Sequence, residues 1–296
     1  MLASYLKLIR PKQWIKNLFV FAPLIFAKDL FEAALFTTTC RAFVTFCLTA
    51  SVVYIVNDIA DVEADRAHPE KRSRPIASGA VARMNALFVA AILLAIDGLI
   101  LAGMDIHFVV ILSIYFVLNL AYSFKLKDVV LLDVFIIAAG FMLRVMGGAY
   151  AIAVPISSWI VLCSLFISLF LGFAKRRGEL VLMNETSGTM KRKVLAKYRI
   201  DFLDQMLTIT AAGTVISYAL YTVAPRTMEV FRTEKLIYTT VFVIYGVFRY
   251  LYLIHTTHAA ENPTNAVTSD IPILGTGILW ILSCILLIYA KGHIFP

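Results

Sequence analysis

NDIADVEAD, residues 57–65, follows directly on the apolar run of residues 38–57, and this stretch decides how the rest of the chain is interpreted. A helix turns by about 100° per residue, so Asp58, Asp61 and Asp65 fall within about 60° of one another around its axis. The sequence therefore predicts three carboxylates on one helical face, at the point where an apolar helix ends.

The composition places this helix in a membrane. Hydrophobic residues make up 60% of the chain and charged residues 16%. Several stretches of about 20 residues carry almost no charge, which is typical of transmembrane helices and excludes a soluble domain. We predict an all-α polytopic membrane protein with about nine transmembrane helices. The expected spans are roughly 14–36, 38–57, 84–103, 107–123, 129–151, 156–174, 203–224, 235–255 and 272–290.

The positive charges predict the orientation in the membrane. Most of the 27 Lys and Arg residues fall on the same side as the amino terminus, and this excess marks the cytoplasmic side. We therefore expect a multi-pass protein of the plasma (inner) membrane whose amino terminus is cytoplasmic and whose carboxyl terminus, after an odd number of spans, is outside. The net charge of +8 follows this topology and suits anionic lipid, and no nucleic-acid motif accompanies it.

Polar clusters follow the inward-pointing ends of the expected helices. They comprise residues 57–65, 122–128 and 175–179, together with Arg249 and Tyr250, whereas the outer loops hold nothing comparable. Clusters on one side of a helical bundle indicate a single cytoplasm-facing cavity with several walls. We expect residues 1–296 to form one transmembrane domain around it.

The acidic helix end is predicted to bind a divalent cation. Mg²⁺ prefers oxygen ligands and usually completes its coordination with waters and substrate phosphates. A basic segment, residues 71–74, follows closely and suits phosphate oxygens that the metal does not reach. We predict that Asp58, Asp61 and Asp65 hold Mg²⁺ on a diphosphate and that Asp58 and Asp61 are catalytic. The alternative is a solvated helix end without a ligand.

One arginine lies inside an expected span. An unpaired guanidinium is costly at the depth of Arg144, so we expect it to be buried in protein. Two interpretations stay open, an ion pair with Asp97 of the third span or a contact with a substrate phosphate. Glycines 140, 147 and 148 share its helical face, which predicts close helix contact or a cavity there.

The motifs resemble the UbiA-type superfamily of intramembrane prenyltransferases over nearly the whole chain. The resemblance rests on the acidic helix end, on Arg-x-Arg-Pro-Ile at residues 72–76 and on Tyr-Ser-x-x-Leu-Lys at residues 122–127. Two further segments, RPKQWIKN at 10–17 and KRRGEL at 175–180, resemble the decaprenyl-phosphate phosphoribosyltransferase branch. The resemblance implies an Mg²⁺-dependent transferase and a product that supplies pentose donors, such as arabinan precursors, for the cell wall.

The chain departs from ordinary prenyltransferases after the sixth span. Enzymes that ionise a prenyl diphosphate generally carry a second acidic motif there, but this segment is basic with a single acid, Glu179. An acidic metal wall opposite a basic wall suits phosphoribosyl pyrophosphate, which carries a diphosphate and a separate 5-phosphate. The expected reaction transfers 5-phosphoribosyl to a polyprenyl phosphate and releases pyrophosphate. The candidates for binding the two substrates are Lys16, Asn17, Asn57, Lys71, Arg72, Arg74, Tyr122, Lys125, Lys127, Lys175, Arg176 and Arg249.

Several alternatives stay open. A prenyltransferase that moves a prenyl group from prenyl diphosphate to a small acceptor would keep the acidic helix end. A transporter or lipid-binding protein is the non-enzymatic alternative, although transporters place polar breaks at the membrane midplane rather than at one face. Tyr122 could be an interfacial anchor, and the cluster at Lys175 could be only a basic membrane flank. A homo-oligomer is left open.

Overall fold

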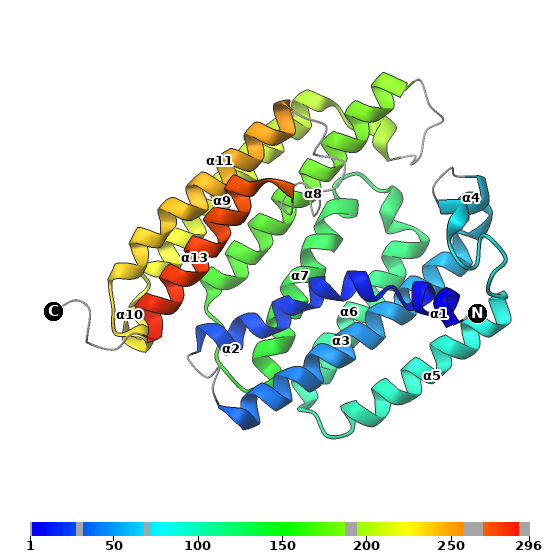
Figure 1. Cartoon of the computed structure of the whole chain (residues 1–296), viewed down its shortest axis with the longest axis horizontal. Coiled ribbons are helices and arrows are strands. Elements are labelled where there is room, and N and C mark those ends of the chain that lie inside the picture. Colours follow the sequence, from blue (N-terminus) through cyan, green and yellow to red (C-terminus); the bar gives the residue numbers. More distant parts are fainter. Residues whose placement is uncertain (1, 28–31, 68–70, 187–193, 257–268, 290–296) are drawn as a thin grey trace. The chain divides into compact units, whose positions relative to one another are not determined.

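The computed structural model describes residues 2–27, 32–67, 71–186, 194–256 and 269–289. Within these ranges the regular structure consists of α-helices and short 3₁₀ helices, labelled η, without strands (Figure 1). The expectation of an all-α membrane fold is confirmed. The chain divides into two compact units, residues 1–156 and 157–296.

The first unit is built around its longest helix, α3. Its elements are α1 (Leu2–Ile9), η1 (Pro11–Phe21), α2 (Ala22–Phe26), α3 (Ala33–Ala60), α4 (Val62–Ala67), η2 (Lys71–Ser73), α5 (Arg83–Leu101), α6 (Ile106–Phe124), η3 (Leu126–Asp128) and α7 (Leu132–Ala151). Helix α3 contacts α5, α6, α7 and η1. Buried residues make up 61% of its most apolar window but only 17% of that of α5, so α3 is central and α5 peripheral.

The second unit is a smaller set of long helices. Its elements are α8 (Ser158–Thr186), η4 (Leu195–Lys197), α9 (Ile200–Thr222), α10 (Pro225–Phe231), η5 (Lys235–Thr239), α11 (Thr240–Thr256) and α13 (Ile271–Tyr289). Helix α8 packs against α9, and α11 packs against both α9 and α13. Helix α8 continues well past the expected end of the sixth span at residue 174, so the basic segment 175–180 is helical rather than part of a loop.

Seven helices in the described ranges are long and apolar enough to cross a membrane, or eight if the bent pair α9 and α10 is one span. The expected count of nine is not confirmed. The difference lies in residues 14–36, where a 3₁₀ helix begins at Pro11 and gives way to the five-residue helix α2, with Pro23 in its first turn. Neither η1 nor α2 by itself reaches the about 20 residues that a helical span requires, so this stretch is not counted among the seven.

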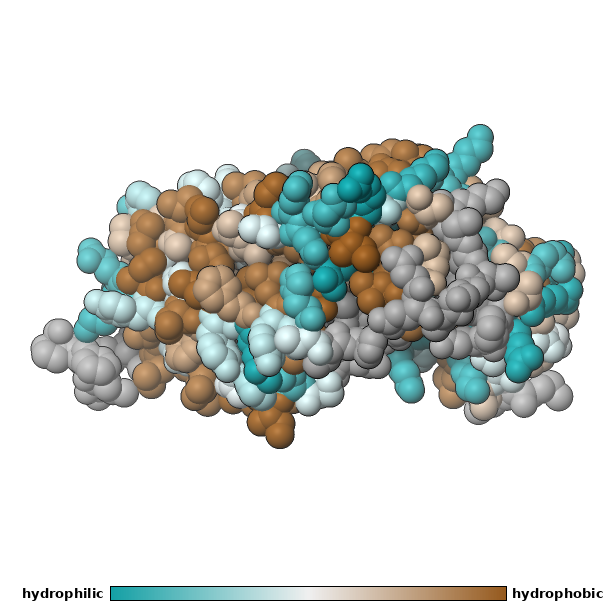
Figure 2. Space-filling model, turned by 90° about the horizontal axis from the view of Figure 1, so that it is seen from above, coloured by the Kyte–Doolittle hydropathy of each residue, from teal (hydrophilic) through white to brown (hydrophobic). Residues whose placement is uncertain are grey.

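Large apolar side chains are exposed on the outer helices, as expected where lipid is the solvent. Phe88 and Leu99 of α5 are 68% and 79% exposed, and Ile278 and Leu282 of α13 are 56% and 57% exposed. Figure 2 shows extensive hydrophobic surface on the visible face of the molecule. A soluble protein rarely exposes so many large apolar side chains, so these helices are assigned to the membrane.

A glycine lets the amino-terminal 3₁₀ helix approach α7 at backbone distance. A Cβ built on Gly148 would lie 2.0 Å from the carbonyl oxygen of Val20 in η1. The close contact predicted for the small face of this helix is thereby confirmed. Because the obstructing atom belongs to the backbone, it cannot move aside by a change of rotamer.

We therefore expect Gly148→Ala to displace η1 and to lower the melting temperature of the protein in detergent. The cost should be about 1–3 kcal/mol, as for overpacked cores. Gly246→Ala in α11 is the matched control, because a Cβ there meets nothing within 4 Å. Replacing that helical glycine should raise stability by about 0.5–1 kcal/mol. Equal melting temperatures for the two variants would contradict the expected contact.

Candidate active site

The acidic segment lies at the carboxyl-terminal end of α3. Helix α3 ends at Ala60, Asp61 is its C-cap, and α4 begins at Val62. The prediction of one continuous helical face is therefore wrong at Asp61, whose φ of −94° and ψ of 8° break the helix. Asp58 and Asp65 are buried, whereas the side chain of Asp61 is 30% exposed.

Two arginines from other segments reach the buried carboxylates. Arg74, which follows η2, donates from Nη1 to Asp58 Oδ1 at 3.0 Å and to Asp65 Oδ2 at 2.7 Å. Arg10, between α1 and η1, also donates to Asp58 Oδ1, and its guanidinium lies 5.0 Å from the ring centroid of Tyr54. Charge-assisted bonds of this kind are among the stronger ones in proteins, so they fix the ends of three segments together.

Arg10 reaches this position through an uncommon backbone conformation. Its φ of 52° and ψ of 58° lie in the left-handed region, which disfavours side chains other than glycine. The residue turns the chain between α1 and η1, and Figure 1 shows α1 and α4 at the same end of α3. Such strain concentrates at functional sites and is consistent with a role for Arg10 there.

The third carboxylate has a partner from a fourth segment. Lys127 of η3 donates from Nζ to both carboxylate oxygens of Asp61, at 2.7 and 2.9 Å. The motif at residues 122–127, some sixty residues away in the sequence, is thus brought to the acidic helix end. Of the predicted residues, the structure unites Asp58, Asp61, Asp65, Arg74 and Lys127, and we call this group with Arg10 the acid–base cluster.

The donor set of the acid–base cluster fits a divalent cation that arrives with phosphate. Among the described residues, no three acidic, His or Cys side chains converge as a ready-made metal cage. Mg²⁺ does not require one, because it is usually bound by one or two carboxylates plus waters and substrate phosphates. Asp58 Oδ2 is buried without a hydrogen-bond partner, which leaves an acceptor for a cation. A buried, unused carboxylate oxygen calls for such an explanation.

The ion pair considered for Arg144 and Asp97 does not form. Arg144 donates to Asn17 Oδ1 at 2.7 Å, to Tyr115 Oη at 2.8 Å and to the carbonyl of Gly140 at 2.8 Å. Asp97 instead accepts a 2.6 Å bond from Thr49 on α3. Helix α5, which carries Asp97, packs on α3, whereas helix α7, which carries Arg144, contacts α6, η1 and α3.

The same contacts place Asn17 inside the bundle. Asn17 is 1% exposed, accepts from Arg144 and donates to Cys47 Sγ at 3.2 Å. Arg144 is 6% exposed and also lies over the rings of Tyr115 and Phe141. This hydrogen-bonded group ties η1 to α6 and α7, so it supports the segment that carries Arg10.

Loss of the Arg144 guanidinium should loosen η1. In Arg144→Met the buried polar groups of Asn17 and Tyr115 lose their partner, which should cost about 1–3 kcal/mol for each group left unsatisfied. We expect a lower melting temperature in detergent and faster proteolysis of the amino-terminal segment. Arg226→Met removes an exposed arginine from α10 and should change neither. Unchanged stability of Arg144→Met would contradict this structural role.

Three predicted ligands belong to the second unit and have partners of their own there. Arg176 is 1% exposed and donates to Glu179 Oε2 at 2.7 Å, and Lys175 lies 4.0 Å from the same carboxylate. Arg249 donates to Asp270 at 2.9 Å, which lowers the pKa of that carboxyl. The single acid of the basic segment is thus already engaged by arginine.

The remaining predicted ligands lie near the residues of the cluster along the chain. Asn57, Lys71 and Tyr122 are partly buried on α3, η2 and α6, and Lys16 is partly buried on η1, whereas Arg72 and Lys125 are exposed. The sequence-based site left out Arg10, Tyr54 and Tyr115. Tyr54 precedes Asp58 by four residues on the same helix, and Arg10 is the first residue of the RPKQWIKN segment, so the sequence held a signal for each of these two residues.

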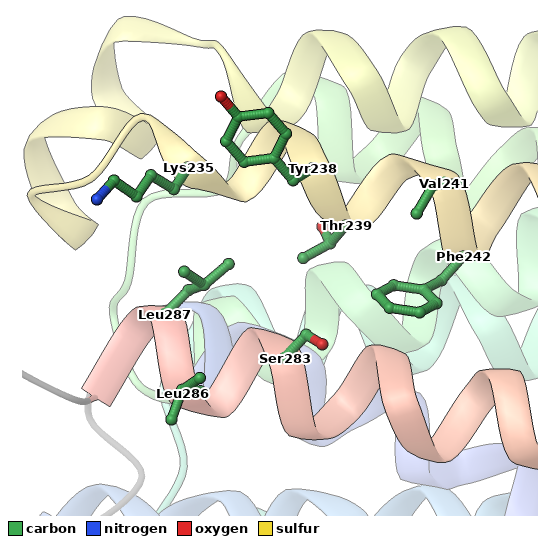
Figure 3. A pocket seen from close by; sticks show the side chains of 8 residues that line it. All are labelled: Lys235, Tyr238, Thr239, Val241, Phe242, Ser283, Leu286 and Leu287. Atoms are coloured by element: carbon green, nitrogen blue, oxygen red, sulfur yellow. The ribbon is translucent and has the colours of Figure 1, made fainter. Parts of the chain in front are cut away.

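A pocket in the second unit has different chemistry. It has a volume of about 480 Å³ and lies between η5, the start of α11, and α13 (Figure 3). Figure 3 shows Thr239 and Phe242 facing Ser283 and Leu287 across it, with Lys235 at one end. None of the described residues that line it carries a carboxylate.

The fold and the acid–base cluster together define an integral membrane protein with paired acidic and basic groups at one helix end. A model of the UbiA prenyltransferase family matches residues 18–266. The chain belongs to the UbiA prenyltransferase family. The resemblance seen in its motifs is therefore confirmed.

Two of the similar sequences belong to enzymes with the same name. The decaprenyl-phosphate phosphoribosyltransferase of Mycolicibacterium smegmatis is 39% identical over 226 residues, which cover 75% of this chain and 70% of that protein. The enzyme of the same name from Corynebacterium glutamicum is 40% identical over 220 residues, 73% of this chain and 66% of that protein. Among solved structures, a UbiA homolog from Archaeoglobus fulgidus bound to DMAPP and Mg²⁺ has a TM-score of 0.73. It covers 96% of this chain and 99% of its own at 17% identity, and the likeness is one of fold.

Proposed function

We propose that the chain is a polyprenyl-phosphate phosphoribosyltransferase. It transfers 5-phosphoribosyl from phosphoribosyl pyrophosphate to a decaprenyl-like polyprenyl phosphate and releases pyrophosphate. The observation that carries the proposal is the acid–base cluster in a chain whose relatives are named decaprenyl-phosphate phosphoribosyltransferases.

The carboxylates of Asp58, Asp61 and Asp65 are the proposed ligands of Mg²⁺, and Asp58 and Asp61 the proposed catalytic residues. When bound, Mg²⁺ would neutralise negative charge on the departing pyrophosphate. Metal use is consistent with the solved UbiA homolog that holds Mg²⁺. This assignment is supported by the unpaired Oδ2 of Asp58 and by the single Arg74 nitrogen that contacts both Asp58 and Asp65.

The basic residues position the two phosphorylated substrates. Hydrogen-bond donors are supplied at the helix end that carries the carboxylates by Arg10, Arg74 and Lys127. These side chains can exchange their carboxylate partners for phosphate oxygens. The other proposed ligands are Lys16, Asn17, Asn57, Lys71, Arg72, Tyr122, Lys125, Lys175, Arg176 and Arg249. Their role is mainly to orient the reacting groups and to stabilise charge, which can account for most of a rate enhancement.

The bond changes need no strong base. The C1–O bond to pyrophosphate breaks as an oxygen of the polyprenyl phosphate bonds to C1 from the opposite face, which inverts that carbon. The attacking phosphate is already an anion, so no proton has to be removed from it. The leaving pyrophosphate takes the electron pair of the broken bond.

The basic segment of the second unit supports phosphoribosyl pyrophosphate, rather than a prenyl diphosphate, as the donor. Glu179 is the single acid in the segment 175–180, and it is paired with Arg176. A second acidic motif for a second metal is thus replaced by buried and partly buried arginine and lysine. Enzymes of the alternative function, prenyl transfer to a small acceptor, generally carry that motif.

The donor is tested by labelling each candidate in turn. Purified protein in lipid nanodiscs is given decaprenyl phosphate with ribose-labelled phosphoribosyl pyrophosphate, or labelled prenyl diphosphate with a small aromatic acceptor. We expect label in the lipid fraction from the ribosyl donor alone. Transfer from the prenyl donor, or from neither, would defeat the proposal.

We further propose one functional domain and a defined orientation. The family model spans residues 18–266 and so includes parts of both compact units, which supports a single domain over 1–296. The positive-inside bias supports a cytoplasmic amino terminus and acid–base cluster, and an odd number of spans would then put the carboxyl terminus outside. Reporter fusions at both termini test this topology, and two cytoplasmic ends would contradict it.

A further inference from the structure

The acid–base cluster balances its own charge. Three carboxylates, Asp58, Asp61 and Asp65, face three cations, Arg10, Arg74 and Lys127, at hydrogen-bond distance. Asp58 and Asp65 are 1% and 3% exposed, and buried carboxylates without a counter-charge would be costly. A divalent cation added alone would therefore compete with cations that the chain already provides.

The competition is sharpest at Arg74. Its Nη1 atom contacts Asp58 Oδ1 at 3.0 Å and Asp65 Oδ2 at 2.7 Å, so one nitrogen links a carboxylate of α3 to one of α4. Arg10 donates to the same Oδ1 of Asp58. Because Mg²⁺ binds oxygen at about 2.0–2.1 Å, a metal ion at these oxygens and the Arg74 nitrogen exclude one another. Oδ2 of Asp58 is buried and has no hydrogen-bond partner among the described residues.

We propose that Arg74, assisted by Arg10, holds the place of the metal in the metal-free protein and passes to diphosphate oxygens when metal and diphosphate bind. This inference rests on the metal site of the proposed function. Its consequence is that metal and diphosphate strengthen each other's binding, because the diphosphate accepts the guanidinium groups that the metal displaces. Coupling between two ligands is reciprocal, so it can be measured from either side.

The test compares the affinity of Mn²⁺, used as the probe ion, for three full-length proteins in detergent without any substrate. Free Mn²⁺ is followed by electron paramagnetic resonance during titration. Arg74→Gln should bind Mn²⁺ at least about tenfold more tightly than the wild type, since a competing charge is removed. Arg83→Gln is the charge-matched control, because Arg83 pairs with the exposed Glu63 of α4. It should stay within about twofold of the wild type.

A second measurement follows the coupling itself. Binding of labelled pyrophosphate to the wild type should strengthen about tenfold or more when Mn²⁺ is present, and this gain should shrink in Arg74→Gln. Melting temperatures are recorded in parallel, because a purely structural Arg74 predicts lower stability together with weaker Mn²⁺ binding. If Arg74→Gln does not fold, Arg10→Gln removes the other guanidinium from Asp58 and carries the same expectation.

The outcomes separate this inference from the proposed function. Wild-type protein that binds Mn²⁺ while Arg74→Gln and Arg10→Gln bind it no more tightly overturns the exchange but leaves the metal site standing. Absence of Mn²⁺ binding by all proteins, even with pyrophosphate, overturns the metal site and the exchange together. Tighter Mn²⁺ binding with weaker coupling in either variant supports the exchange.

Discussion

Asp58→Asn should lower kcat/KM for phosphoribosyl transfer by about 10³-fold or more, while the protein still folds. Asp58 is 1% exposed and meets both Arg74 and Arg10. The amide keeps the size and one acceptor oxygen of the carboxylate but loses the charge that binds a metal ion and stabilises charge development. Initial rates with labelled phosphoribosyl pyrophosphate and decaprenyl phosphate measure the loss.

The control for Asp58→Asn is Glu63→Gln. Glu63 lies in the same acidic segment, but its side chain is 73% exposed and pairs with Arg66 and Arg83. Its removal should change the rate by less than about threefold, as is usual for exposed ion pairs. Gel filtration and melting curves of both variants establish that each is folded. Wild-type activity in folded Asp58→Asn would remove Asp58 from the catalytic site.

Removal of divalent metal should have an effect of the same size. After treatment with EDTA and desalting, we expect product formation to fall by about 10³-fold or more and to return on addition of Mg²⁺. The physical reason is that the cluster's own cations already neutralise its carboxylates. While these cations stay paired with the carboxylates, they do not supply the additional positive charge that a metal ion would bring to the leaving pyrophosphate.

The metal experiment needs a control for damage by the chelator. A second sample receives EDTA that has first been saturated with Ca²⁺, so that the chelator is present without free binding capacity. This sample, resupplied with Mg²⁺, should keep full activity and an unchanged melting temperature. Full activity in the metal-free sample would show that the carboxylates serve another purpose and would defeat the proposed mechanism.

The fold class could be predicted because it depends on composition over long windows. Hydrocarbon requires about 20 apolar residues for each helical span, and this length is directly visible in a sequence. The weakest prediction was residues 14–36, where the structure forms the 3₁₀ helix η1 and the five-residue helix α2 in place of one long α-helix. Average hydropathy does not distinguish 3₁₀ from α-helical geometry.

The residue types of the candidate site were also visible in the sequence, but not their partners. Asp58, Asp61 and Asp65 could be placed at a helix end, and Arg74 and Lys127 could be selected by motif. The partner of Arg144 could not be chosen between Asp97 and a ligand, and the structure gives it Asn17 and Tyr115 instead. A buried guanidinium must find acceptors, yet the sequence does not say which helices face one another.

By itself the sequence determined that this chain enters a membrane as a helical bundle with an acidic helix end, because hydropathy and helical periodicity are local properties. Only the tertiary structure decided that Arg10, Arg74 and Lys127, from three separate segments, meet the carboxylates of α3 and α4. Those contacts depend on how helices pack and on the break at Asp61, which sends Asp58 and Asp65 to Arg74 and Asp61 to Lys127. Pairing of opposite charges in a buried place is set by three-dimensional distance, and no spacing along the chain encodes it directly.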